Sequence, residues 1–147
     1  MKNLFLVVLL LFTALSCEKQ DTSCSCDDPA PCDAFAVLDN SAYQDGPDDP
    51  YFLREANIED DCLYLRFQYG GGCREVDFDL VGAFQLGETA PLTRFVRVAL
   101  DDDDNCEALI TEEVTFNLKP LRVEGEEELR ILIGNPEGED FSVVYTY

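Results

Sequence analysis

Cysteine is the residue type with the most chemistry open to it here, because thiols form disulfides, bind metals and carry lipids. The seven cysteines of this 147-residue sequence are Cys17, Cys24, Cys26, Cys32, Cys62, Cys73 and Cys106. No His is present, which excludes Ser–His and Cys–His nucleophile pairs and every His-ligated metal site. The C-x₂-C pairs typical of zinc sites are also absent. If the chain is exported, these cysteines are therefore expected to form disulfides.

One disulfide is expected between Cys73, beside a glycine turn, and Cys106, after an aspartate-rich loop. Each cysteine opens a predicted strand, so the bond would tie two neighbouring strand starts and stabilise the fold by about 3–4 kcal/mol. Cys62 would then pair with Cys24, Cys26 or Cys32, and the sequence leaves the choice open. The other two of Cys24, Cys26 and Cys32 would pair with each other.

The second group that could do chemistry is the run Asp101, Asp102, Asp103, Asp104 and Asn105. Carboxylate oxygens suit Ca²⁺, but the alternating spacing of a calcium loop is missing, and adjacent side chains on an extended backbone point opposite ways. We expect a solvated acidic turn with weak Ca²⁺ binding at most, no metal site and no cofactor.

If the disulfide brings the two turns together, Arg74 lies beside the aspartates at one edge of the domain. We therefore predict that this edge contacts a partner. Its residues are Arg74, Asp101, Asp102, Asp103 and Asp104.

Residues 1–16 have the pattern of a secretory signal. Lys2 is charged, and residues 4–15 are almost wholly apolar but too short for the roughly 20 residues that span a membrane. Small Ser16 followed directly by Cys17 resembles a bacterial lipoprotein signal, whose cysteine is lipidated and becomes the new N-terminus. Cysteine parity agrees, because seven minus one leaves an even set of six for disulfides.

The expected location is therefore the cell envelope, with a lipid on Cys17 attaching the protein to the outer membrane. Some lipoproteins of Bacteroidetes carry an acidic stretch here that directs them to the cell surface. Lys19 and Gln20 interrupt the acidity of Glu18 and Asp21, so the side of the membrane stays open. We expect residues 17–32 to form the lipidated tether and residues 33–147 to form a single domain.

The formal net charge is −21, from 31 acidic and 10 basic residues. Such a surface repels nucleic acid and anionic lipid headgroups, and it is compatible with cationic partners. Nucleic acid is therefore not an expected partner.

Alternation of apolar and polar residues runs through most of the chain after residue 50. One face of the first run carries Leu63, Leu65, Phe67 and Tyr69, and later runs centre on Phe78, Val98, Phe116, Ile131 and Val143. The sequence predicts an all-β, single antiparallel β-sandwich or barrel-like domain of about six to eight strands, stapled by disulfides.

Two local expectations follow from the same pattern. The alternating runs on either side of Gly70, Gly71 and Gly72 predict a β-hairpin. The apolar C-terminal run 143–147 has no polar stop, so we expect it to pair inside the sheet rather than at an open edge.

Two segments carry a resemblance to a family. The segment 69–80, YGGGCREVDFDL, and the segment 105–111, NCEALIT, are similar to a group of uncharacterised lipoproteins from Bacteroidetes and related bacteria. The similarity covers about residues 55 to 120 and implies an exported β domain without assigned catalytic residues. Relatives often have His where this chain has Val76, so no His-dependent activity carries over.

The sequence favours a membrane-anchored interaction module, not an enzyme, with an unidentified protein or glycan as the partner. One alternative is a protease inhibitor that presents the turn 86–92 as a rigid loop. A less favoured alternative is a glycoside hydrolase, which would need two carboxyl groups about 5–10 Å apart in a cleft.

Overall fold

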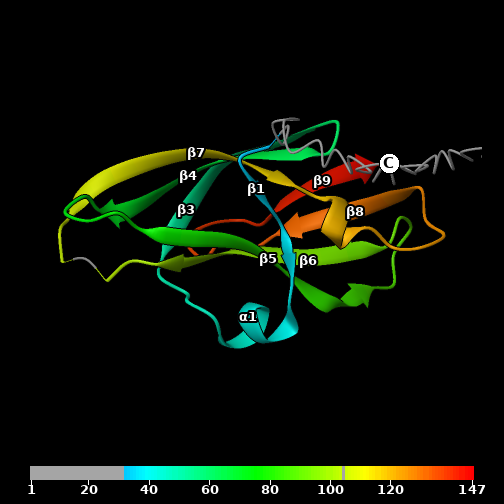
Figure 1. The fold of residues 1–147 in the computed structure, drawn as a ribbon, viewed down its shortest axis with the longest axis horizontal. Coiled ribbons are helices and arrows are strands. Elements are labelled where there is room, and N and C mark those ends of the chain that lie inside the picture. The colour runs from blue at the N-terminus through cyan, green and yellow to red at the C-terminus, as the bar shows by residue number, and fades with distance from the viewer. Residues whose placement is uncertain (1–31, 104) are drawn as a thin grey trace, which may run out of the picture.

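The structure is a computed structural model that describes residues 32–103 and 105–147. The expected signal peptide, Cys17, Cys24, Cys26 and Asp104 lie outside the described residues. The described chain folds into two β-sheets that pack face to face (Figure 1), so the predicted all-β sandwich is confirmed.

The first sheet, which we call sheet A, has the strand order β1-β7-β4-β3. Its strands are β1 (Ala34–Phe35), β3 (Tyr51–Glu59), β4 (Cys62–Gly71) and β7 (Ala108–Asn117). The second sheet, sheet B, has the order β2-β5-β6-β8-β9. Its strands are β2 (Val37–Leu38), β5 (Asp77–Gly87), β6 (Thr93–Asp101), β8 (Glu128–Ile133) and β9 (Phe141–Thr146). The β1–β2 segment runs from one sheet to the other (Figure 1).

Both sheets contain parallel as well as antiparallel neighbours. The pairs β1–β7, β2–β5 and β6–β8 are parallel, and the other described pairs are antiparallel. An alternating sequence shows which side chains share a face, but it does not show the direction of the neighbouring strand.

The hairpin predicted around the glycine cluster is wrong. β4 pairs with β3 and β7 in sheet A, whereas β5 pairs with β2 and β6 in sheet B. The chain leaves sheet A at Gly72, whose φ of 105° is a backbone conformation that favours glycine. The glycines therefore serve a crossing between layers, and a hairpin and a crossing leave the same alternating pattern.

The C-terminal run pairs with β8, but it forms the outer strand of sheet B. The expectation that it lies inside the sheet is therefore wrong. β3, the outer strand of sheet A, packs near β9, so the two free edges lie close to each other.

The core lies between the two sheets and is built around Phe67 of β4. This side chain is fully buried and makes edge-to-face contacts with Tyr51 at 5.8 Å and with Phe78 at 5.3 Å between ring centroids. Because Phe78 belongs to sheet B, the aromatic contacts join the two layers.

The helix α1 (Asn40–Asp45) lies against the outer face of sheet B (Figure 1). Asp39 caps its start by accepting hydrogen bonds from the backbone N–H groups of Ser41 and Ala42. The 3₁₀-helix η1 (Lys119–Leu121) follows β7. In the described parts of the chain, no helix is long and apolar enough to cross a membrane.

Candidate binding site

A concave pocket of about 560 Å³ lies where β3 turns back into β4. We call it the acidic pocket, and its lining is Glu55, Asn57, Glu59, Asp60, Asp61, Cys62, Tyr64 and Thr115. The alternation of β3 turns Glu55, Asn57 and Glu59 to one face of sheet A. Asp60 has a positive φ of 52° in the tight turn, which brings the polar side chains of both strands together.

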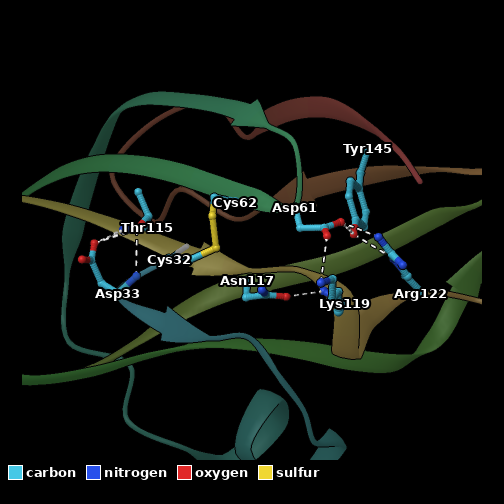
Figure 2. Close-up of a disulfide and its surroundings, with 9 residues drawn as sticks. All are labelled: Cys32, Asp33, Asp61, Cys62, Thr115, Asn117, Lys119, Arg122 and Tyr145. Carbon is cyan, nitrogen blue, oxygen red and sulfur yellow. Dashed lines mark hydrogen bonds and ion pairs between the residues drawn. A yellow bond between two sulfur atoms is a disulfide. The ribbon is translucent and has the colours of Figure 1, made fainter. Parts of the chain in front are cut away.

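Asp61 anchors one wall of the acidic pocket (Figure 2). One of its oxygens, Oδ1, accepts a hydrogen bond from the Tyr145 hydroxyl and pairs with the Arg122 guanidinium. The other, Oδ2, lies 3.2 Å from Lys119 Nζ. Arg122 Nε also donates to the Tyr145 oxygen at 2.8 Å. Because Asp61 comes from the β3–β4 turn and Tyr145 from β9, this network ties the two sheets together.

The network shifts the ionisation of its members. The hydrogen bond from Tyr145 and the two neighbouring cations hold the pKa of Asp61 below its ordinary value. Burial, together with the Asp61 carboxylate, raises the pKa of Tyr145 to about 12. At neutral pH, Asp61 is therefore a carboxylate and Tyr145 a neutral donor.

A disulfide and a second carboxylate hold Cys62 and Thr115, two further lining residues of the acidic pocket (Figure 2). Cys62 is bonded to Cys32, one of the three partners that the sequence left open. Next to it, Asp33 accepts hydrogen bonds from the backbone N–H of Thr115 at 2.8 Å and from its hydroxyl at 2.7 Å. These hydrogen bonds lower the pKa of Asp33. Both pocket residues, Cys62 and Thr115, are therefore fixed by the segment that enters the domain.

The remaining carboxylates of the acidic pocket are uncompensated. Glu55, Glu59 and Asp60 are exposed, and within residues 32–103 and 105–147 none of them forms an ion pair with a basic side chain. Asn57 Nδ2 lies 3.5 Å from a Glu55 oxygen, a long and weak hydrogen bond.

Tyr64 contributes an aromatic ring to the same hollow. Its pKa is raised by desolvation and by the carboxylates of Glu113 and Glu55. The phenol therefore stays neutral beside these charges. A neutral ring among free carboxylates can bind a cation by charge attraction and by its π face.

The edge that the sequence singled out is also brought together. The predicted disulfide between Cys73 and Cys106 is present and joins the end of β4 to the start of β7. Arg74 Nη1 donates to the Asp103 carbonyl at 3.0 Å and lies 3.6 Å from its carboxylate. Asp101 and Asp102 line the same small cavity of about 180 Å³.

This edge has little room for a ligand, and Arg74 already contacts the aspartate loop. In the part of the chain that the structure describes, no group of three Cys, Asp or Glu side chains is arranged to hold a metal ion. Asp104, the fourth aspartate of the run, is outside that part. The binding role of this edge stays a prediction.

The two alternative functions can be placed in the fold. The turn 86–92 connects β5 to β6 in sheet B, whereas the turn between β3 and β4 belongs to sheet A. Asp33 and Asp61 have lowered pKa values, the opposite of the raised pKa that a glycosidase needs in its general acid.

Sequence reasoning missed the acidic pocket, although a signal was present. Glu55, Asn57 and Glu59 alternate with Ala56 and Ile58, which already indicates a polar face on this strand. The run of aspartates is the more conspicuous pattern in the sequence, but the length of an acidic run does not predict a concave surface.

Comparison with known proteins identifies the fold. Neither a protein-family model nor a curated protein matches the sequence. A DUF1344 protein of unknown function from Bacteroides vulgatus superposes with a TM-score of 0.55 at 15% identity, covering 78% of this chain and 56% of that one. A protein from Parabacteroides distasonis described as toxin-related superposes with a TM-score of 0.54 at 20% identity, covering 77% of this chain and 60% of that one.

A NigD-like immunity protein from Bacteroides caccae gives a TM-score of 0.51 at 14% identity, covering 75% of this chain and 57% of that one. This chain therefore spans less than two thirds of the length of these three structures. At these identities the likeness concerns the fold alone: the chain is similar in fold to parts of these three proteins from Bacteroides and Parabacteroides.

Proposed function

We propose that this protein is a lipid-anchored, extracytoplasmic binding module whose acidic pocket holds Lys or Arg side chains of a protein partner. The observation that carries the proposal is a hollow of about 560 Å³ in which Glu55, Glu59 and Asp60 lie free beside the ring of Tyr64. The walls of this hollow are fixed by a disulfide and by the Asp61 network.

The pocket concentrates enough interactions for specificity. A single exposed ion pair contributes only about 0–1 kcal/mol, so one carboxylate would not select a partner. Three carboxylates and an aromatic ring on β3, β4 and the tight turn between them act on the same cationic segment without first being ordered. Such a site favours a partner with two or more basic side chains close together.

The tether that leads to the proposed lipid anchor would join the domain next to the acidic pocket. Cys32, the first described residue, is bonded to Cys62 in the wall of the acidic pocket. If Cys17 carries the lipid, residues 18–31 bridge at most about 50 Å when fully extended. The pocket would then meet partners close to the membrane surface.

The names of the structural neighbours bear on the kind of partner. Proteins with this fold include one named as an immunity protein and one described as toxin-related. Among cationic polypeptides, we therefore favour a toxin as the partner that this module would bind.

A capped Lys-Ala-Lys-Ala-Lys peptide is a suitable probe, with affinity measured by calorimetry at low salt. One variant removes three pocket charges: Glu55→Gln, Glu59→Gln and Asp60→Asn. The matched control removes three charges elsewhere: Asp79→Asn, Glu88→Gln and Glu124→Gln. The pocket variant should bind about tenfold more weakly than the wild type, and the control at most about twofold.

Equal losses in the two variants would mean that the peptide senses only the net charge of −21, and the proposal would be wrong. Replacing every Lys of the peptide by Gln should abolish binding to all three proteins.

A further inference from the structure

Arg54 lies in β3 directly before Glu55, the first of the β3 residues that line the acidic pocket, and its setting is unusual. It is the extra residue of a β-bulge, because Leu53 pairs with Phe67 and Glu55 pairs with Arg66. Bulges re-aim a side chain and are common beside binding sites. Here the bulge lays the exposed guanidinium over the ring of Phe52, with its central carbon 4.0 Å from the ring centroid.

The guanidinium is also held from the side. Arg54 Nε donates to Gln68 Oε1 at 2.6 Å, and Gln68 Nε2 donates to Thr111 Oγ1 at 3.0 Å. Phe52, Gln68 and Thr111 form a cross-strand row through β3, β4 and β7. Three strands of sheet A therefore orient one arginine before any ligand arrives.

No carboxylate neutralises this arginine. Among the described residues, no carboxylate oxygen of Asp or Glu lies within 4.0 Å of the Arg54 guanidinium. Three other arginines have partners: Arg66 pairs with Glu113, Arg122 pairs with Asp61, and Arg97 binds backbone carbonyls. Arg54 is held by a neutral amide and an aromatic ring, so in a chain with 31 acidic residues its charge is available to an external group.

Two hollows meet at Phe52 and Arg54. One, of about 380 Å³, also contacts Gly70 and Leu109, and the other, of about 550 Å³, contacts Asn135 and Phe141. Gly70 leaves the floor of the first hollow open, since a Cβ there would meet no atom within 4 Å. Leu109, 69% exposed, offers an apolar wall beside the charge.

We propose that Arg54 binds the carboxylate of an Asp or Glu in an extended peptide segment, whose neighbouring apolar side chain fills the hollow over Gly70. The terminal nitrogens of the guanidinium donate to the two carboxylate oxygens, and Leu109 and Phe52 contact the apolar group.

Acidic side chains near Arg54 limit which peptides can bind there. Glu137 lines the smaller hollow, and Glu139 and Asp140 line the larger one. They repel a strongly acidic chain, so the segment that fits carries one carboxylate among apolar or basic residues. This site is distinct from the acidic pocket, and its test does not depend on the function proposed there.

The test uses the purified ¹⁵N-labelled protein and two capped peptides, Ala-Leu-Asp-Leu-Ala and Ala-Leu-Asn-Leu-Ala. The Asp peptide should shift the Nε–Hε signal of Arg54 and the side-chain amide of Gln68, and the Asn peptide should not. Arg54→Gln should weaken binding of the Asp peptide at least about fivefold. Arg66→Gln makes the same change of charge on the same sheet face and should weaken it less than about twofold.

A second variant tests the hollow without removing charge. Gly70→Val fills open space, so the fold and the Arg54 signal should persist while the Asp peptide loses affinity at least about fivefold. Equal effects of Arg54→Gln and Arg66→Gln, or equal binding of the two peptides, would overturn the proposal. So would a galacturonate oligosaccharide that shifts the Arg54 signal when the Asp peptide does not.

Discussion

At the scale of single residues, Asp61 has the largest set of contacts in the acidic pocket. It joins the β3–β4 turn to Tyr145, Lys119 and Arg122. Its pKa is lowered in the folded state, so as pH falls the unfolded chain takes up the proton first. The stability that Asp61 contributes is therefore fully present above its unfolded pKa of about 3.9 and is lost as pH falls through the folded value.

Asp61→Asn should lower the free energy of unfolding by about 1–2 kcal/mol at neutral pH, because Tyr145 and two cations lose their ionised partner. The difference from the wild type should shrink below about pH 4. Denaturant unfolding between pH 2 and 7 measures it. Asp79→Asn, an exposed carboxyl without an ion pair in the described chain, is the control; a pH-independent difference at Asp61 would contradict the account.

Arg94 is a second residue with an unusual environment. It is 4% exposed, and its guanidinium donates to the carbonyls of Ala83, Phe84 and Leu121. Burial lowers its pKa, as expected for a charge away from water. The side chain fastens η1 to the bulged part of β5.

Arg94→Met should cost about 2–4 kcal/mol in unfolding free energy, since three carbonyls lose their donor. Arg66→Met, which removes an exposed ion pair, should cost less than about 1 kcal/mol. Chemical denaturation of both variants gives the comparison. A cost at position 94 no greater than that at position 66 would show that the buried contacts do not stabilise the fold.

At the scale of elements, α1 depends on the sheet beneath it. Six residues are too few for a stable helix in water. Arg97 on β6 binds the C-terminal end of α1 through the carbonyls of Ala42, Tyr43 and Gly46. The guanidinium of Arg97 thus donates hydrogen bonds to the backbone carbonyls at the end of the helix.

Arg97→Ala should therefore release α1 while the sandwich remains folded. We expect amide hydrogen exchange to accelerate at least about tenfold at Tyr43 and Gly46, whose N–H groups bond within the helix. The amides of β8 report the global fold and should be unchanged. Uniform acceleration across both sheets would contradict the local role of Arg97.

The elements also show how far sequence reasoning reaches. The alternation of Leu63, Leu65 and Phe67 correctly predicts a strand with one buried face, and the core confirms it. The partner of that strand could not be predicted, because alternation is the same for a hairpin and for a crossing between sheets. Gly72 is a turn residue, as the sequence predicts, but the chain passes from it into sheet B rather than into a hairpin.

Some features of the candidate sites could be predicted from the sequence and others could not. The Cys73–Cys106 bond followed from two cysteines at predicted strand starts, and it is present, although Cys73 follows the end of β4 rather than opening a strand. The acidic pocket and the bulge at Arg54 depend on register between β3 and β4, which the sequence of either strand does not contain. The register between strands decides which side chains line a hollow, so neither site could be predicted from the sequence alone.

At the scale of the whole molecule, the proposed anchor and the fold meet at Cys32. The bond to Cys62 fastens the start of the domain to sheet A, so a pull on the tether would be borne by the sandwich rather than by β1. This arrangement suits a domain held on a membrane by its N-terminal segment.

The anchor predicts a specific mature mass. Expression in a bacterium that processes lipoproteins should yield a chain beginning at Cys17 with three acyl chains, found in the membrane fraction. Cys17→Ser should move the protein to the soluble envelope fraction with its disulfides intact. An unmodified Cys17, or membrane association that survives the substitution, would contradict the anchoring proposal.

The central claim is that a cationic segment is held in the acidic pocket rather than spread over a surface of net charge −21. Intermolecular NOE contacts between the capped Lys-Ala-Lys-Ala-Lys peptide and the labelled protein test it most directly. We predict contacts from the lysine methylenes to the ring of Tyr64, with shifts confined to Glu55, Asn57, Glu59 and Thr115. Contacts distributed equally over Asp77, Asp79 and Glu137 would contradict it.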